Sequence, residues 1–160
     1  MAGMKWAAFP IPWYAKLNTP QRVQTCIRDS LNKWSDASGG KLTFKQSLRP
    51  VSNGITFLWS KKGLLPNGFS LERSSGYTLV YGENEILKTC SVSINAKDFR
   101  FHIGEPAGFG PQVWKGRRDV CLNTVMVHEI GHALGLDHVD SAASIMNRSP
   151  KFMEPQPFDV

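Results

Sequence analysis

One segment near the start of the chain has apolar residues at three- and four-residue spacing, which is typical of a helix with one buried face. Thr19 is predicted to be its N-cap and Pro20 its first residue, since proline at that position loses no backbone hydrogen bond. The helix is predicted to end before Gly39 and Gly40. The residues that form the apolar stripe are Val23, Ile27, Leu31 and Trp34.

Short runs rich in β-branched and aromatic residues, separated by turn residues, predict strands. The first is expected at 11–18, before the helix. The clearest pair is 77–81 and 87–95, which we expect to be neighbours because residues 82–84 make a turn, although not necessarily a tight hairpin. The other expected strands are 42–44 and 55–59.

A second helix is predicted after a long loop. Residues 96–118 contain many glycines and prolines and show no periodicity, so we interpret them as a loop. Asp119 is predicted to cap the next helix, whose apolar residues do not share one face and therefore indicate a largely buried element. The tail over 147–160 has no periodicity.

Length and composition fit a single domain over 1–160. Hydrophobic residues make up 41% of the 160 residues and charged residues 20%, near the averages of folded proteins, which argues against a disordered or fibrous chain. No repeat or linker is present, and no apolar run reaches the roughly 18 residues of a membrane span, so no membrane insertion is expected.

The net charge of +6 raises the question of a nucleic-acid partner. The lysines and arginines are scattered, with adjacent pairs only at 61–62 and 117–118. Nucleic-acid binding needs clustered positive charge, so we expect no nucleic-acid partner.

The cysteines and the N-terminus leave the compartment open. Of Cys26, Cys90 and Cys121, at least one is unpaired within the chain. One disulfide, such as Cys90–Cys121, and three buried thiols both fit. Residues 1–13 lack the features of a signal peptide, which keeps an intracellular protein among the alternatives.

The stretch that carries chemistry begins at Val127 and reads Val-His-Glu-Ile-Gly-His-Ala-Leu-Gly-Leu-Asp-His. His128 and His132 are four residues apart, so on a helix they project from the same side and can bind one metal ion. Glu129 lies beside the first ligand, where its carboxylate can act as general base toward a zinc-activated water.

Gly135 is predicted to end this helix, because glycine accepts the left-handed conformation of a helix terminus. The turn would bring His138 to the same ion. Three imidazoles leave one position open, which is typical of a catalytic rather than a structural zinc site, so we expect one catalytic Zn²⁺.

A bare pair of histidines at this spacing also occurs by chance. Here, however, three of the four histidines in the chain fall within residues 128–138, in ligand order and accompanied by the glutamate and the glycine. This combination strongly favours a metal site.

The motif resembles that of the metzincin zinc proteases, H-E-x-x-H-x-x-G-x-x-H followed by a Met-turn. Met146 is placed where that methionine belongs and would form an apolar floor beneath the metal. The chain is most similar to the matrixins, the matrix-metalloproteinase-like family. Arg148 stands where astacins and serralysins have a tyrosine ligand, which argues against those branches.

The resemblance implies an α+β fold: a twisted, mostly parallel sheet of about five strands with an antiparallel edge strand, packed on two long helices, with the active-site helix ending at a glycine turn. It extends to residues 34–36, the strand at 42–44 and Trp114. It also favours a secreted protein.

Several family features are not matched. Matrixins of animals have a second, structural zinc bound by three histidines and an aspartate, whereas only His102 is spare here. We therefore expect that site to be absent. The cysteine switch of the zymogens is missing, and the family's C-terminal helix is expected to be short or missing. A structural calcium ion is compatible with the resemblance, but no feature indicates one.

Substrate is implied to lie along an edge strand above the metal. The strand at 77–81 is the candidate, with Thr78, Leu79 and Val80 as substrate contacts, and a plain sheet strand is the alternative. Arg148 is interpreted first as a solvated side chain; the alternative is that it lines the pocket beyond the cleaved bond and favours acidic or polar substrate side chains there.

The predicted function is zinc-dependent endopeptidase activity on extended polypeptides, carried out by a monomer. Two alternatives remain at this point. One is another zinc hydrolase, such as an amidase or a deformylase, which can share the shorter H-E-x-x-H motif. The other is a non-catalytic binding module that zinc stabilises.

Overall fold

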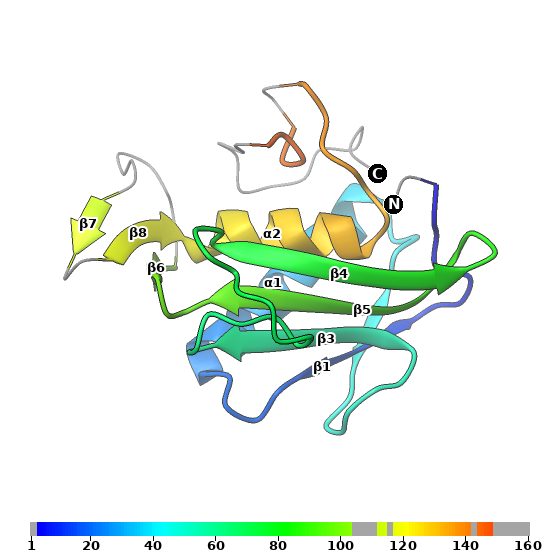
Figure 1. Ribbon diagram of the computed structural model, residues 1–160. Helices are drawn as coiled ribbons and strands as arrows, with labels where there is room; N and C mark the ends of the chain where they lie inside the picture. The colour runs from blue at the N-terminus through cyan, green and yellow to red at the C-terminus, as the bar shows by residue number, and fades with distance from the viewer. Residues whose placement is uncertain (1–2, 104–111, 115–116, 142–143, 149–160) are drawn as a thin grey trace.

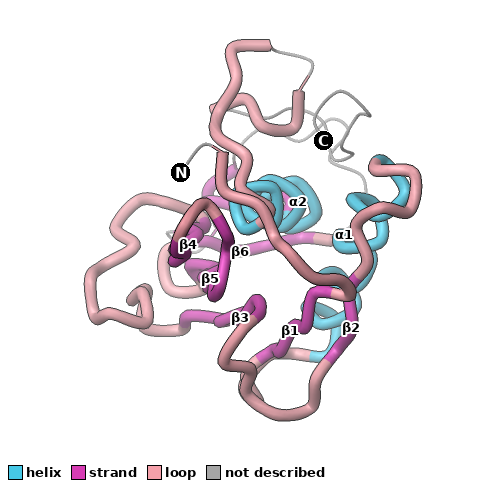
Figure 2. The backbone as a smooth tube through the Cα atoms, turned by 90° about the vertical axis from the view of Figure 1, so that its right-hand side faces the viewer, coloured by secondary structure: helices cyan, strands magenta, loops and turns pink. Residues whose placement is uncertain are grey.

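A five-stranded sheet and two helices form the body of the protein, as seen in the computed structural model (Figure 1). The structure describes residues 3–103, 112–114, 117–141 and 144–148. Viewed from the side, both helices lie on the same side of the sheet (Figure 2). Their buried faces and the facing strands share one apolar core. No helix in these ranges is long and apolar enough to cross a membrane.

The sheet has the order β2-β1-β3-β5-β4, in which all pairs are parallel except β4–β5. This architecture confirms the predicted α+β fold with an antiparallel edge strand. The strands are β1 (Ile11–Ala15), β2 (Phe44–Gln46), β3 (Gly54–Ser60), β4 (Gly76–Glu83) and β5 (Ile86–Asn95).

Helix α1 (Gln21–Ala37) buries the predicted stripe, including Trp34, which is fully buried. The helix ends as predicted, since Gly39 and Gly40 both have positive φ. Its start differs. Pro20 is the N-cap rather than the first helical residue, because its ψ of 149° is extended.

Helix α2 (Leu122–Ala133) is buried over most of its length, as predicted for the helix that carries the motif. It packs against α1, where the Trp34 indole N–H donates to the backbone oxygen of Val127 at 2.9 Å. The Trp6 indole N–H donates to the oxygen of Ala133 at 2.8 Å, which provides a partner for a carbonyl of the last turn.

Two short strands predicted from composition differ from those observed. The first strand ends at Ala15 rather than at residue 18, because Lys16–Thr19 forms a turn closed by a 2.9 Å hydrogen bond from the Thr19 N–H to the Lys16 oxygen. The strand expected at 42–44 instead covers Phe44–Gln46, where it pairs with β1 from Ile11 onward.

The loop predicted over 96–118 is wrong in part. Phe99–His102 (β6), Gln112–Trp114 (β7) and Arg117–Cys121 (β8) form a second sheet in the order β6-β8-β7. Asp119 is not a helix cap, because it pairs within this sheet and Cys121 is the N-cap of α2. The tail was predicted over residues 147–160, of which the structure describes only 147 and 148, so the tail and the short or missing C-terminal helix lie mostly outside the described part.

All three cysteines are buried thiols outside any disulfide, so the Cys90–Cys121 bridge is absent and the alternative of buried thiols holds. Burial raises the pKa of the Cys26 thiol to about 11 and that of the Cys90 thiol to about 12. Both thiols are therefore protonated near neutral pH.

Candidate metal centre

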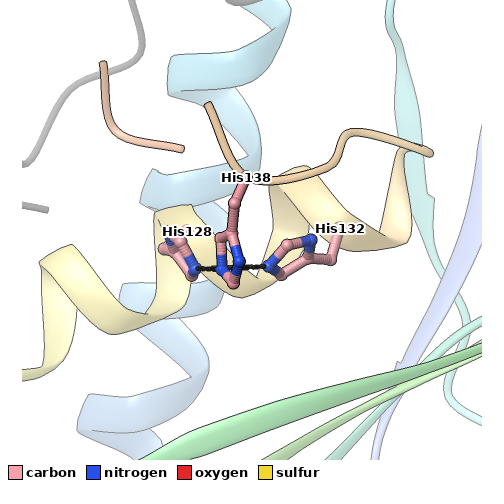
Figure 3. Close-up of side chains that lie close together, drawn as sticks. All are labelled: His128, His132 and His138. Atoms are coloured by element: carbon pink, nitrogen blue, oxygen red, sulfur yellow. Dashed lines mark hydrogen bonds between the residues drawn. The ribbon is translucent and has the colours of Figure 1, made fainter. Parts of the chain in front are cut away.

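Helix α2 carries His128 and His132 one turn apart, and their rings point toward one another and toward His138 (Figure 3). His128 is buried, with 7% of its surface exposed, and His132 is half-buried. The helix places the two Nε2 atoms 3.2 Å apart. The four-residue spacing thus directs both rings to one point, as helix geometry requires.

His138 reaches the same point because the chain reverses after α2. Gly135 has a φ of +98°, the left-handed conformation that glycine adopts readily, and a Cβ there would overlap the Met4 backbone oxygen. The His138 Nε2 lies 3.2 Å from the Nε2 atoms of both His128 and His132. The three nitrogens form an equilateral triangle.

Two backbone carbonyls fix the tautomers of the rings. The His128 Nδ1 lies 2.7 Å from the Ile145 oxygen, and the His132 Nδ1 lies 2.7 Å from the Leu136 oxygen. A carbonyl oxygen only accepts, so each Nδ1 carries the hydrogen and each Nε2 of a neutral ring presents its lone pair. Lone pairs directed at one another at this distance repel unless a cation lies among them.

The electrostatic environment favours neutral rings. Burial lowers the pKa of His128 to about 4, although its bond to Ile145 acts in the opposite direction. Burial also lowers the pKa of His132, and desolvation followed by the charge of Arg148 lowers that of His138. A histidine binds a metal ion only as an unprotonated imidazole, so the lowered pKa values favour metal binding.

The donor set fits zinc. Tetrahedral zinc with Zn–N bonds of about 2.0–2.1 Å holds its nitrogens about 3.3 Å apart, close to the observed 3.2 Å. The rings of His128 and His132 also have a carbonyl partner at the opposite nitrogen, which is the arrangement that fixes ligand orientation in such sites. Of the residues that the structure describes, these three form the group able to hold a metal ion.

Met146 lies against the helix at this site. It is 1% exposed, and a Cβ on Gly131, between the two helical ligands, would overlap its sulfur. The segment that contains it is closed by a 3.0 Å bond from the Val139 N–H to the Met146 oxygen. The same segment provides the Ile145 carbonyl that bonds His128. The packing of Met146 against α2 therefore also helps to orient the His128 ring.

Glu129 comes directly after the first histidine and is buried, with 8% exposed. Burial raises the pKa of its carboxyl to about 7, although a hydrogen bond from Thr78 acts in the opposite direction. The Thr78 hydroxyl lies 2.8 Å from Glu129 Oε1. The carboxyl group therefore contacts the edge strand β4, which comes 51 residues earlier in the chain.

The structure brings one of the other predicted site residues, Thr78, to the Glu129 carboxyl. Thr78, Leu79 and Val80 lie on β4, the sheet edge next to α2, whereas Arg148 is exposed near His138. The contact between the Thr78 hydroxyl and Glu129 was not predicted from the sequence. No local signal indicates it, because it depends on how β4 is placed against α2.

Comparison with known protein families adds a match over almost the whole chain. Residues 5–160 match the matrixin peptidase family. The chain belongs to the matrixins. As a matrixin with a three-histidine site, it is a zinc metalloprotease domain, and Glu129 stands next to its first ligand. No curated protein sequence matches it.

Proposed function

We propose that this matrixin hydrolyses internal peptide bonds of extended polypeptides, with zinc bound by His128, His132 and His138 and with Glu129 as general base. The observation that carries the proposal is the triangle of Nε2 atoms, 3.2 Å on each side, with the Glu129 carboxyl on the adjacent helix position. All of these residues belong to one chain, so the proposed site needs no residue from a second copy.

Bound zinc would polarise the scissile carbonyl and lower the pKa of water. Glu129 accepts a proton from the attacking water as its oxygen bonds to the carbonyl carbon. The same carboxyl then gives that proton to the leaving amine as the carbon–nitrogen bond breaks. Its burial keeps competing water away and raises its affinity for the proton.

The edge strand β4 would bind the substrate backbone. A bond from the Asn95 N–H to the Ser75 oxygen makes these two residues a hydrogen-bonded antiparallel pair. Because such pairs alternate along an antiparallel ladder, the backbone groups of Thr78 and Val80 point to the open edge and those of Leu79 point to β5. An extended peptide can therefore pair with Thr78 and Val80.

The pocket beyond the cleaved bond would lie toward Arg148. This side chain is exposed and its positive charge acts on His138. We propose that it favours acidic or polar substrate side chains there. A peptide library would show this preference weaken in Arg148→Ala if the contact is direct.

The central test is hydrolysis of quenched peptides and unfolded casein by the wild type and by Glu129→Ala, each assayed with and without a chelator. We expect activity that the chelator removes and zinc restores. Glu129→Ala should retain zinc and lose activity by about 10²–10⁴-fold, the usual contribution of a general base.

Two outcomes would contradict the proposal. An enzyme that hydrolyses small amides or formyl groups but leaves unfolded protein intact would be another zinc hydrolase. A protein whose activities are all unchanged in Glu129→Ala would use zinc only for its fold.

A further inference from the structure

The Thr78 hydroxyl is placed between two acceptors of one residue. It lies 2.8 Å from Glu129 Oε1 and 2.9 Å from the Glu129 backbone oxygen. Neither acceptor carries a hydrogen when the carboxyl is ionised, so Thr78 is the donor. A hydroxyl has one hydrogen to donate, and a charged acceptor forms the stronger bond. The carboxylate is therefore the preferred partner.

A second residue of β4 contacts the same side chain. Gly76 is two positions from Thr78 and lies on the same face of the strand. A Cβ on Gly76 would come within 3.1 Å of Glu129 Cγ and 3.1 Å of Val125 Cγ1. The strand thus contacts Glu129 at two points, the stem beside Gly76 and the carboxylate at Thr78.

The side chain and the backbone of Thr78 point in different directions. Its hydroxyl points to α2, while the alternation that begins at the Asn95–Ser75 pair directs its N–H and C=O to the open edge. A substitution of the side chain alone therefore leaves the backbone groups available for substrate. This separation makes the role of the hydroxyl testable.

We propose that Thr78 is a positioning residue, whose hydroxyl holds the Glu129 carboxylate in the orientation needed for proton transfer. The inference rests on the proposed role of Glu129 as general base. Glutamate has three side-chain torsions, and burial alone does not select among their combinations. A donor on the rigid sheet selects one of them, as catalytic geometry requires.

The simpler alternative is that the hydroxyl only joins β4 to α2 through the Glu129 backbone oxygen. The two interpretations predict different effects of Thr78→Val, which removes the hydroxyl with little change of shape. A purely structural bond predicts lower stability and an unchanged kcat. The positioning role predicts a lower kcat and an unchanged KM.

The first experiment measures kcat and KM on a quenched peptide for Thr78→Val and Thr78→Ser, with zinc content determined for each. We expect Thr78→Val to lose about 10- to 100-fold in kcat, the scale of a misplaced catalytic group, with KM nearly unchanged. Thr78→Ser keeps the hydroxyl and should restore most of kcat. Thr25→Val, the same change on the exposed surface of α1, is the matched control and should behave as wild type.

The second experiment needs no activity. The free energy of unfolding is measured without metal for Thr78→Val, Glu129→Ala and the double variant. A bond to the carboxylate makes the two changes non-additive, by about fivefold or more in the unfolding equilibrium constant. A bond to the backbone oxygen alone leaves them additive, because Glu129→Ala retains that oxygen.

The inference is overturned if Thr78→Val keeps the wild-type kcat, if Thr78→Ser is as slow as Thr78→Val, or if the two changes are additive. Failure of the proposed function has a different signature. In that case the wild type cleaves no peptide or Glu129→Ala remains active, whereas the unfolding cycle still reports whether Thr78 holds the carboxylate.

Discussion

Gly131 is the residue that allows α2, α1 and the Met146 segment to meet. It lies between the ligands His128 and His132, and a Cβ there would overlap the Met146 sulfur and lie 3.0 Å from Trp34 Cζ2. Any larger residue must displace buried side chains that pack against α2 at this position. Glycine is retained here despite its low helix propensity, because the space is already filled.

We therefore expect Gly131→Ala to lower the free energy of unfolding by about 1–2 kcal/mol, since overpacking outweighs the gain in helix propensity. Chemical denaturation measures this difference. In a Met146→Ala background the same change should cost much less, because the displaced sulfur is gone. An equal cost in both backgrounds would show that the overlap with Met146 is not the cause.

The spacing of the histidines predicts that they meet at one point. It does not predict which other groups orient their rings and the Glu129 carboxyl. Ile145 and Leu136 act on the histidine rings through backbone oxygens, which every residue type provides. The hydroxyl of Thr78 meets Glu129 only because of the placement of β4 beside α2. Such contacts depend on tertiary structure and have no local sequence pattern.

At the scale of elements, periodic segments were predicted and irregular ones were not. The stripe of α1 and the long alternating strand β5 are recognisable because many residues repeat one pattern. The sheet of β6, β7 and β8 was missed, since its strands are short and glycine and proline are frequent around them. The pairing of β4 with β5 was predicted correctly, but the exact position of the turn between them was not.

That hairpin turns at Asn84 and Glu85, whose φ values are +53° and +65°. Two consecutive positive values define the tight turn that matches strand twist, and glycine is the usual second residue. Glutamate at this position is therefore strained. The turn was predicted over residues 82–84, so its existence was correct but its position was shifted toward the N-terminus. The backbone of Glu85 also accepts a 3.1 Å bond from the Lys5 N–H.

We expect Glu85→Gly to stabilise the protein by about 0.5 kcal/mol, because relief of left-handed strain of about 1 kcal/mol exceeds the entropic cost of glycine. Thermal unfolding at equal zinc concentration measures the change. Lys88→Gly, within β5, is the control and should destabilise. If both glycines destabilise, the turn is not strained in the way that the φ values indicate.

At the scale of the whole molecule, the three histidines of the candidate metal site come from two parts of the chain, helix α2 and the segment that follows it. His128 and His132 belong to α2, whereas His138 belongs to the segment that returns from Gly135 toward Met146. An ion bound by all three must stabilise the folded chain, because the unfolded chain does not hold them together. Removal of zinc should therefore lower the unfolding temperature.

At free zinc about 100-fold above its dissociation constant, the stabilisation is about 2.7 kcal/mol, or roughly 5–11 °C for a domain of this size. Differential scanning calorimetry with and without a chelator measures it. His138→Ala leaves the helical pair intact but removes the ligand that closes the segment, so most of the zinc-dependent shift should disappear. His102→Ala, the same change at the histidine outside the cluster, should retain the shift. If His138→Ala keeps the full shift, zinc is bound by the helix alone and the triangle is not the metal site.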